Sequence, residues 1–222
     1  PSLARLRGGA LLALSRGGAV ATQMAVQIAV GSVAGAAGIG LLQLHMAWSN
    51  LAGELVGVGE ASRALRDTAI HADTGGRDAI REHLRRALLR IAACTLLLTL
   101  AVGLALRITP IALSPASCAL VFAVLLAAPG FAAVRVLAEA LKALGDPLAA
   151  VTLENLAVPL ALLSMCAGVA LGLLEARPAG LLVSAIAGLA LALVLLWLRL
   201  RRHLTALTAR GKQALHRAPG GH

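Results

Sequence analysis

Polar and charged side chains interrupt long apolar stretches of this sequence at spacings that place them on shared helix faces. Gln23 and Gln27 lie four residues apart and share one face. Gln43, Asn50 and Glu54 form a stripe through spacings of seven and four. Polar groups in an apolar helix are costly and usually face a bundle interior or a water-filled cavity. They are therefore candidate cavity residues, although glutamines also hydrogen-bond neighbouring helices and Glu54 could lie at a headgroup level.

A second set combines both charges. Arg135 and Glu139 are four residues apart, and Lys142 follows three residues later. This spacing allows an ion pair on one helix face, which reduces the cost of burying charge. Arg135 and Glu139 are therefore candidate cavity residues. The alternative is that Arg135 and Glu139 lie near a membrane interface, with Arg135 extending its charge towards water.

The third set lies beside a proline inside an apolar stretch. Glu154 and Asn155 precede Pro159. Proline has no N–H and removes the helical hydrogen bond to the carbonyl four residues earlier. We expect a local kink that leaves the carbonyl of Asn155 available beside two polar side chains.

No motif of an enzyme active site occurs. The sequence has no His, Asp and Glu cluster with metal-ligand spacing, no nucleophile elbow and no phosphate-binding glycine loop. Cys94, Cys118 and Cys166 lie in different apolar stretches without paired spacing, as is typical of small apolar core residues. We expect neither catalysis nor a metal or cofactor.

The elements that carry these residues are predicted to be membrane helices. Of 222 residues, 59% are hydrophobic and only 14% are charged, and the mean hydropathy is +0.86. A soluble domain has roughly a quarter of its residues charged. The ranges 17–53, 108–134, 155–174 and 178–198 contain no Asp, Glu, Lys or Arg. A membrane span needs about 20 consecutive, mostly apolar residues.

Aromatic residues make up 2% of the sequence, which argues against a membrane barrel with aromatic girdles. The fold class is all-α.

Breaker residues divide the chain into six predicted spans. Gly35, Gly38 and Gly40 predict a tight turn, Pro110 and Pro115 close the third span, and Gly145-Asp146-Pro147 predicts a helix stop and restart. The predicted spans are 17–36, 39–59, 87–106, 117–137 with an extension towards 144, 147–174 and 178–198. They form one bundle over 17–200, between a basic N-terminus, 1–16, and a basic tail, 201–222. The first apolar stretch is too long for a cleavable signal peptide and is followed by others. Because the chain begins at Pro1 and not at Met, we expect a fragment or a processed product.

The basic residues predict how this bundle is oriented. With six spans and both ends in the cytoplasm, 17 of the 20 Lys and Arg residues lie inside. Only Arg107 and Arg177 lie outside, and Arg135 lies within a span. A single span over 17–59 would place the N-terminal arginines opposite the basic segment 60–86. Topology therefore accounts for the net charge of +10, and we expect no nucleic-acid partner because the basic segments lack stacking aromatics.

The basic segment 60–86 is predicted to form one or two helices on the membrane surface. Its arginines either contact anionic lipid headgroups or only enforce topology.

The order of these features resembles the N-terminal half of polysaccharide and oligosaccharide flippases of the multidrug/oligosaccharidyl-lipid/polysaccharide exporter superfamily. The resemblance rests on the Gly35–Gly40 turn, on the basic run Arg81–Leu89, and on a fourth-to-fifth junction that reads Glu139-Ala-Leu-Lys-Ala-Leu-Gly-Asp-Pro147, followed by Glu154-Asn155 and Pro159. It covers most of residues 8–200.

The resemblance implies a bacterial inner-membrane protein that moves a lipid-linked glycan by alternating access between two lobes. A polar, partly cationic cavity would hold the glycan and its pyrophosphate. Arg135 would bind the anion, and Glu54, Glu139 and Glu154 would pair with it or couple to protons or sodium.

This chain departs from the family in its span count, because the family has twelve to fourteen spans. Three explanations fit six predicted spans: a truncated transporter, a half-transporter that pairs with a second lobe or with itself, and a remnant.

Two other classes of function stay open. One is a membrane-embedded enzyme of envelope biosynthesis, for which a carboxylate and histidine cluster at one membrane face is expected. The other is a scaffold subunit.

Overall fold

The chain folds as a bundle of helices, and the computed structural model describes residues 3–73, 76–108, 114–175 and 177–217. These residues form α1 (Leu3–Val56), α2 (Glu60–Asp73), α3 (Arg77–Ile108), α4 (Pro115–Ala143), α5 (Pro147–Ala170) and α6 (Pro178–Arg217), with no strand among them. Five of the helices, all except α2, are long and apolar enough to cross a membrane. The all-α membrane fold predicted from composition is therefore confirmed.

The predicted turn in the first apolar stretch is confirmed, but it is confined to one residue. Gly35 has φ 67° and ψ −171°, which interrupts the 54-residue α1, whereas Gly38 and Gly40 are helical. Backbone in this region is almost exclusive to glycine because a Cβ would clash with the adjacent peptide groups. An unbroken helix of that length would be about 80 Å long, far more than the roughly 30 Å of a bilayer core.

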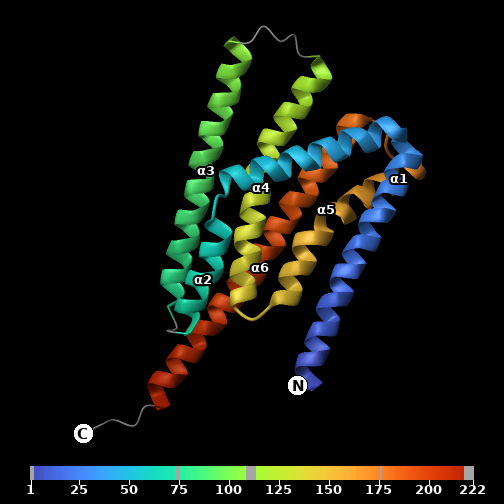
Figure 1. Ribbon diagram of the computed structural model, residues 1–222. Coiled ribbons are helices and arrows are strands. Elements are labelled where there is room, and N and C mark those ends of the chain that lie inside the picture. Colours follow the sequence, from blue (N-terminus) through green and yellow to red (C-terminus); the bar gives the residue numbers. More distant parts are fainter. Residues whose placement is uncertain (1–2, 74–75, 109–113, 176, 218–222) are drawn as a thin grey trace.

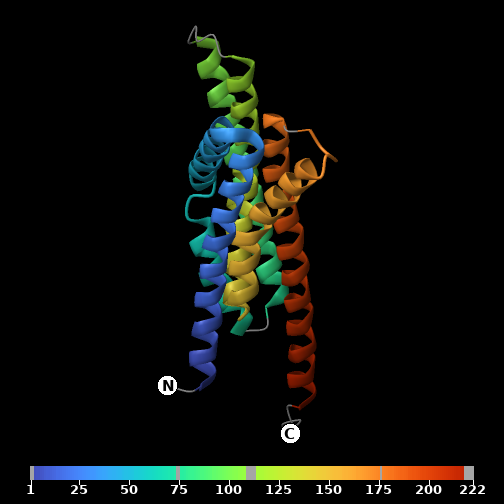
Figure 2. The same cartoon turned by 90° about the vertical axis from the view of Figure 1, so that its right-hand side faces the viewer.

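The two halves of α1 take different courses. The first half runs along the bundle, and the second half turns at the kink and crosses over α4 towards α2 (Figure 1). Figure 2 shows the same crossing segment nearly end-on. Gly53 allows the crossing, because a Cβ there would lie 3.0 Å from Cβ of Phe131 and 3.3 Å from the carbonyl oxygen of Ala128. The second half therefore packs closely across α4 and does not lie antiparallel to the first.

The basic segment 60–86 forms α2 and the first turns of α3. Glu60 begins α2 and is buried, with its Oε1 atom accepting from Arg90 Nη1 of α3 at 2.6 Å and from Arg63 Nη1 at 3.3 Å. Asp67 of α2 contacts His83 of α3 at 3.3 Å. The Glu60–Arg90 ion pair and the Asp67–His83 contact connect α2 to α3, and α2 also packs along α4.

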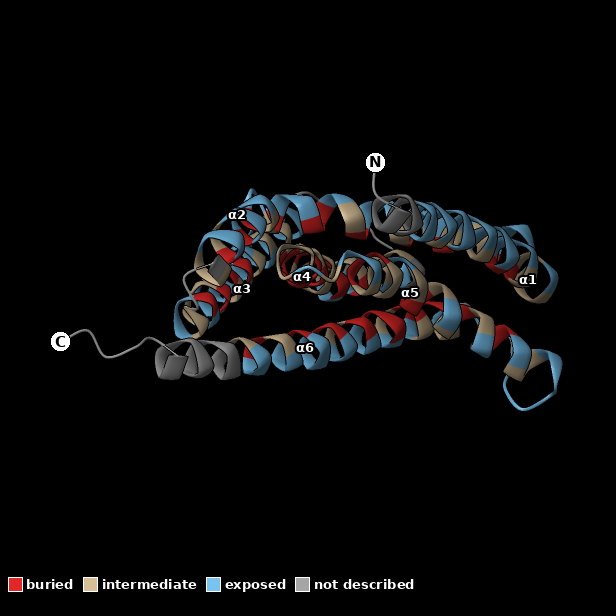
Figure 3. Ribbon diagram, turned by 90° about the horizontal axis from the view of Figure 1, so that it is seen from below, coloured by how far each residue is buried: buried red, intermediate tan, exposed pale blue. Residues whose placement is uncertain are grey.

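Helix α4 is the central element, in contact with all five other helices. Its buried positions are mostly alanines, including Ala127, Ala128, Ala132 and Ala138, so neighbouring helices approach closely. Viewed from below, α4 and α5 lie between α1 and α6 (Figure 3). The start of α1, the end of α2, the start of α3, the α4–α5 turn and the end of α6 lie at one end of the bundle (Figure 1), here called the basic end.

The α4–α5 turn is built as the sequence predicts. Gly145 has φ 86°, Asp146 caps α5 by accepting from the N–H of Ala149 at 3.3 Å, and Pro147 begins the helix. Asp146 Oδ2 also accepts from Arg199 Nε at 2.7 Å and lies 3.1 Å from His203 Nε2. Partial burial opposes ionisation of Asp146, but the hydrogen bonds from Arg199, His203 and the Ala149 N–H outweigh it and lower the pKa of this carboxyl. The turn is thereby attached to α6.

Several predicted boundaries need correction. Helix α5 ends at Ala170 and not at Leu174, because Gly172 takes φ 71° and the N–H of Leu173 bonds back to the Gly168 carbonyl. Helix α3 begins ten residues before the predicted span, and the predicted N-terminus and tail are helical from Leu3 and up to Arg217. Pro115 begins α4, and Pro110 lies outside the described residues.

Candidate functional site

Five of the eight predicted site residues line one cavity inside the bundle. The cavity has a volume of about 200 Å³ and lies between α1, α4, α5 and α6. Its polar lining residues are Gln23, Asn50, Arg135, Glu154 and Asn155. We call it the Arg135 cavity. The sequence predicts these residues on four separate spans, and the packing brings them together.

Arg135 binds the second half of α1, not its own helix. Its Nη1 atom pairs with Oε1 of Glu54, and its Nη2 atom donates to Oδ1 of Asn50 at 3.3 Å. The ion pair with Glu139 that the spacing of four allowed is therefore replaced by an interhelical pair. The physical reason is that α1 crosses α4 at this level and brings a carboxylate and an amide to the guanidinium.

A second charged group lies next to the cavity. Lys142 Nζ donates to Oε1 of Glu139 at 2.7 Å and to Oε2 of Glu154 at 3.4 Å. Glu139 is thus paired within α4, while Lys142 joins α4 to the lining residue Glu154 of α5. Lys142 is not among the predicted site residues, but it connects these two carboxylates.

The charges around the cavity nearly cancel. Arg135 and Lys142 carry two positive charges, and Glu54, Glu139 and Glu154 carry three negative charges, so the group has a formal net charge of −1. The partly cationic cavity that the family resemblance implies is therefore not found in this conformation. Glu54 is the most accessible of these carboxylates, with 67% of its side chain exposed against 25% each for Glu139 and Glu154. An anion that paired with Nη1 of Arg135 would compete with Glu54 for this nitrogen.

Glu154 and Asn155 lie in the part of α5 where Pro159 is expected to disturb the helical hydrogen bonds. Pro159 lies inside α5 and lines the cavity together with Glu154 and Asn155, and Figures 1 and 2 show α5 bending partway along its length. The side-chain amide of Asn155 donates to the Val151 carbonyl at 2.8 Å. Pro159 cannot donate to the carbonyl of Asn155, so that carbonyl can accept from a bound solute.

Gln27 is the predicted residue that the structure places away from the cavity. It is exposed on the first half of α1 and is not among the lining residues, whereas Gln23, one turn earlier, is. The two glutamines are one turn apart on α1, but only Gln23 lines the cavity.

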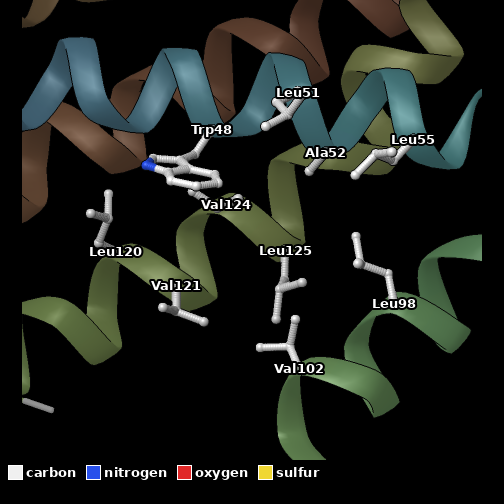
Figure 4. Close-up of a pocket in the computed structure, with 10 residues that line it drawn as sticks. All are labelled: Trp48, Leu51, Ala52, Leu55, Leu98, Val102, Leu120, Val121, Val124 and Leu125. Atoms are coloured by element: carbon white, nitrogen blue, oxygen red, sulfur yellow. The ribbon is translucent and has the colours of Figure 1, made fainter. Parts of the chain in front are cut away.

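An apolar groove lies on the opposite side of the crossing half of α1. It has a volume of about 330 Å³, and its residues come from α1, α3 and α4: Trp48, Leu51, Ala52, Leu55, Leu98, Val102, Leu120, Val121, Val124 and Leu125. Figure 4 shows these side chains pointing into the space between the three helices. Along α1, Trp48 and Leu55 line the groove, whereas Asn50 lines the cavity. The sequence did not reveal this groove, because its residues are ordinary apolar helix residues.

Comparisons with protein-family models, with curated proteins and with solved structures gave no match. The class of the protein is defined by its architecture: it is a helical, multi-pass membrane protein, with five helices able to span a bilayer among the residues that the structure describes.

Proposed function

We propose that this chain is one lobe of a transporter that flips a lipid-linked oligosaccharide or polysaccharide precursor across a bacterial inner membrane. The observation that carries the proposal is the pairing of a polar cavity with an apolar groove on opposite sides of one helical segment. Such a substrate has a polar glycan with a phosphate group and a long hydrocarbon chain. The Arg135 cavity offers hydrogen bonds and an arginine, and the groove offers a purely apolar lining.

The Glu54–Arg135 pair supplies a way to couple binding to movement. A phosphate oxyanion would compete with Glu54 for the guanidinium of Arg135, since arginine binds carboxylate and phosphate with the same bidentate geometry. Glu54 lies on the half of α1 that follows the kink at Gly35. Its release would remove an ion pair that holds this segment across α4. A proton or a sodium ion bound by the Glu54 carboxylate would have the same effect and would couple the lobe to an ion gradient.

The volume of the cavity supports a lobe that works with a partner. About 200 Å³ is less than the roughly 300–1,000 Å³ of pockets that enclose a drug-sized ligand. A second lobe, or a second copy of this chain, would complete the path. The exposed upper part of α3, with Leu96, Leu97, Leu100 and Leu104, can contact either lipid or such a partner.

The experiment that tests this function is a flipping measurement in vesicles. The purified chain is reconstituted with a fluorescent lipid-linked oligosaccharide, and a membrane-impermeant quencher is added outside. We expect quenching to extend to the inner-leaflet probe, and a phospholipid carrying the same fluorophore should remain protected. Quenching that stops at the outer leaflet for both probes, with the second lobe present as well, would exclude the flippase function.

We further propose six spans with both ends in the cytoplasm, so that the crossing half of α1 counts as the second span. Single cysteines at the exposed positions Ala37, Ser62 and Ser114 can be introduced after the three native cysteines are replaced by alanine. We expect an impermeant maleimide added to intact cells to label Ala37→Cys and Ser114→Cys, and Ser62→Cys only after lysis. Labelling of positions 37 and 62 from the same side would show that 39–59 does not cross.

A further inference from the structure

A third surface feature lies at the basic end of the bundle, outside the proposed transport site. Two adjoining pockets of about 320 and 340 Å³ lie between α3 and α6, and they share Arg81 and Trp197. Arg77, Arg201 and Leu204 complete the first pocket, and Leu84, Arg85, Leu88 and Leu89 complete the second. Together they form one continuous depression, here called the arginine groove.

The groove changes in character along the bundle axis. Helix α3 runs away from the basic end and α6 runs back towards it (Figure 1). Arg77 and Arg81 therefore lie nearer the basic end, and Leu88 and Leu89 nearer the middle of the bundle. Arg201 likewise lies nearer the basic end than Trp197. The groove is thus cationic at its outer end and apolar at its inner end.

The cationic end of the groove is lined by arginine side chains. The lining of the two pockets includes four arginines and no Asp or Glu. Arg81 and Arg201 form no ion pair within the described part of the chain, whereas the nearby Glu82 pairs with Arg86 at 2.9 Å and with Arg85 at 3.5 Å. Two unpaired guanidinium groups from facing helices form a ready site for a phosphate group.

From this geometry we infer that the arginine groove binds a single anionic phospholipid of the cytoplasmic leaflet. Its phosphate would contact Arg81 and Arg201, and an acyl chain would lie along Leu84, Leu88 and Trp197. Tryptophan is favoured at this depth because its ring is apolar while its N–H can reach the headgroup region. The site does not depend on the proposed transport function, because it shares no residue with the Arg135 cavity or the apolar groove.

The test compares lipids bound to the purified full-length chain by native mass spectrometry, after addition of dioleoyl phosphatidylglycerol or dioleoyl phosphatidylcholine. We expect phosphatidylglycerol to bind preferentially to one site. The double variant Arg81→Gln/Arg201→Gln should bind it roughly tenfold or more weakly, because each arginine near a lipid surface contributes about 1 kcal/mol. The matched control is Arg86→Gln/Arg202→Gln, which removes the same charge from the same helices outside the groove and should bind as the wild type does.

Three results would overturn the proposal: equal binding of the two lipids, equal losses in the two double variants, or displacement of the bound lipid by excess glycerol phosphate. The last result would assign the groove to a soluble anion. If the double variant does not fold, each single variant provides the same comparison, with Arg86→Gln or Arg202→Gln as its control. With either the double or the single variants, we expect phosphatidylglycerol to raise the melting temperature of the wild type and not that of the groove variants.

Discussion

Replacing Arg135 with alanine is expected to abolish flipping of the lipid-linked glycan while leaving membrane insertion intact. The substitution removes the guanidinium that contacts Glu54 and Asn50 and that we assign to the substrate phosphate. Loss of a charge-assisted, bidentate contact between arginine and phosphate costs about 3 kcal/mol, so the rate of flipping should fall about 100-fold or more. The measurement is the vesicle quenching rate, together with surface polysaccharide in cells that carry the variant in the intact transporter.

Two further variants separate the role of Arg135 in binding from a structural role. Arg135→Lys keeps the charge but loses the bidentate geometry, and we expect partial activity. Glu54→Gln removes the competing carboxylate, so we expect tighter substrate binding and a weaker dependence of the rate on a proton gradient. Arg107→Ala, at the exposed end of α3, is the control and should flip at the wild-type rate. Normal surface glycan in the Arg135→Ala strain would contradict the assignment of the cavity.

Replacing Gly35 with alanine is expected to destabilise the protein by about 1–3 kcal/mol, because φ 67° with ψ −171° is a conformation that residues with a Cβ avoid. No neighbouring atom lies within 4 Å of a Cβ built there, so the effect isolates backbone strain from steric clash. The variant either keeps the kink under strain or straightens, and a straight α1 would lose the contact of the crossing half with α4. We expect a lower melting temperature in detergent.

The matched control for Gly35 lies five residues away. Gly40 is helical and also has open space around a Cβ, so Gly40→Ala should stabilise the helix by up to about 1 kcal/mol. Opposite signs in the two variants would demonstrate that the kink is required for the fold. A melting temperature that rises equally in both would show that position 35 is helical in the membrane.

Much of the architecture could be predicted from the sequence because it depends on local chemistry. Long uncharged stretches require an apolar solvent, and glycine, aspartate and proline in succession stop and restart a helix whatever surrounds them. The break at Gly35 and the turn at Gly145-Asp146-Pro147 are of this kind. The observed end of α5 lies a few residues before the predicted one. The reason is that Gly172 ends the helix, before the polar loop that follows.

The partners of the charged residues could be decided only by the tertiary structure. Spacing along the chain shows which side chains share a face of one helix, so it offered Glu139 as the partner of Arg135. The actual partner, Glu54, is 81 residues away and reaches Arg135 because the second half of α1 crosses α4. The same holds for Asp146 with Arg199, which is 53 residues distant, and for the meeting of Arg81 with Arg201 in one groove.

The sequence by itself thus determined that this is a helical membrane protein, which residues in its helices are polar, and where its main breaks lie. The tertiary structure decided that five of these polar residues share a cavity, that its charges nearly cancel, and that an apolar groove lies across α1 from it. The physical reason is that hydropathy and backbone propensity act within a helix, whereas ion pairs between helices depend on the crossing positions that close packing of small residues such as Gly53 and Ala132 permits.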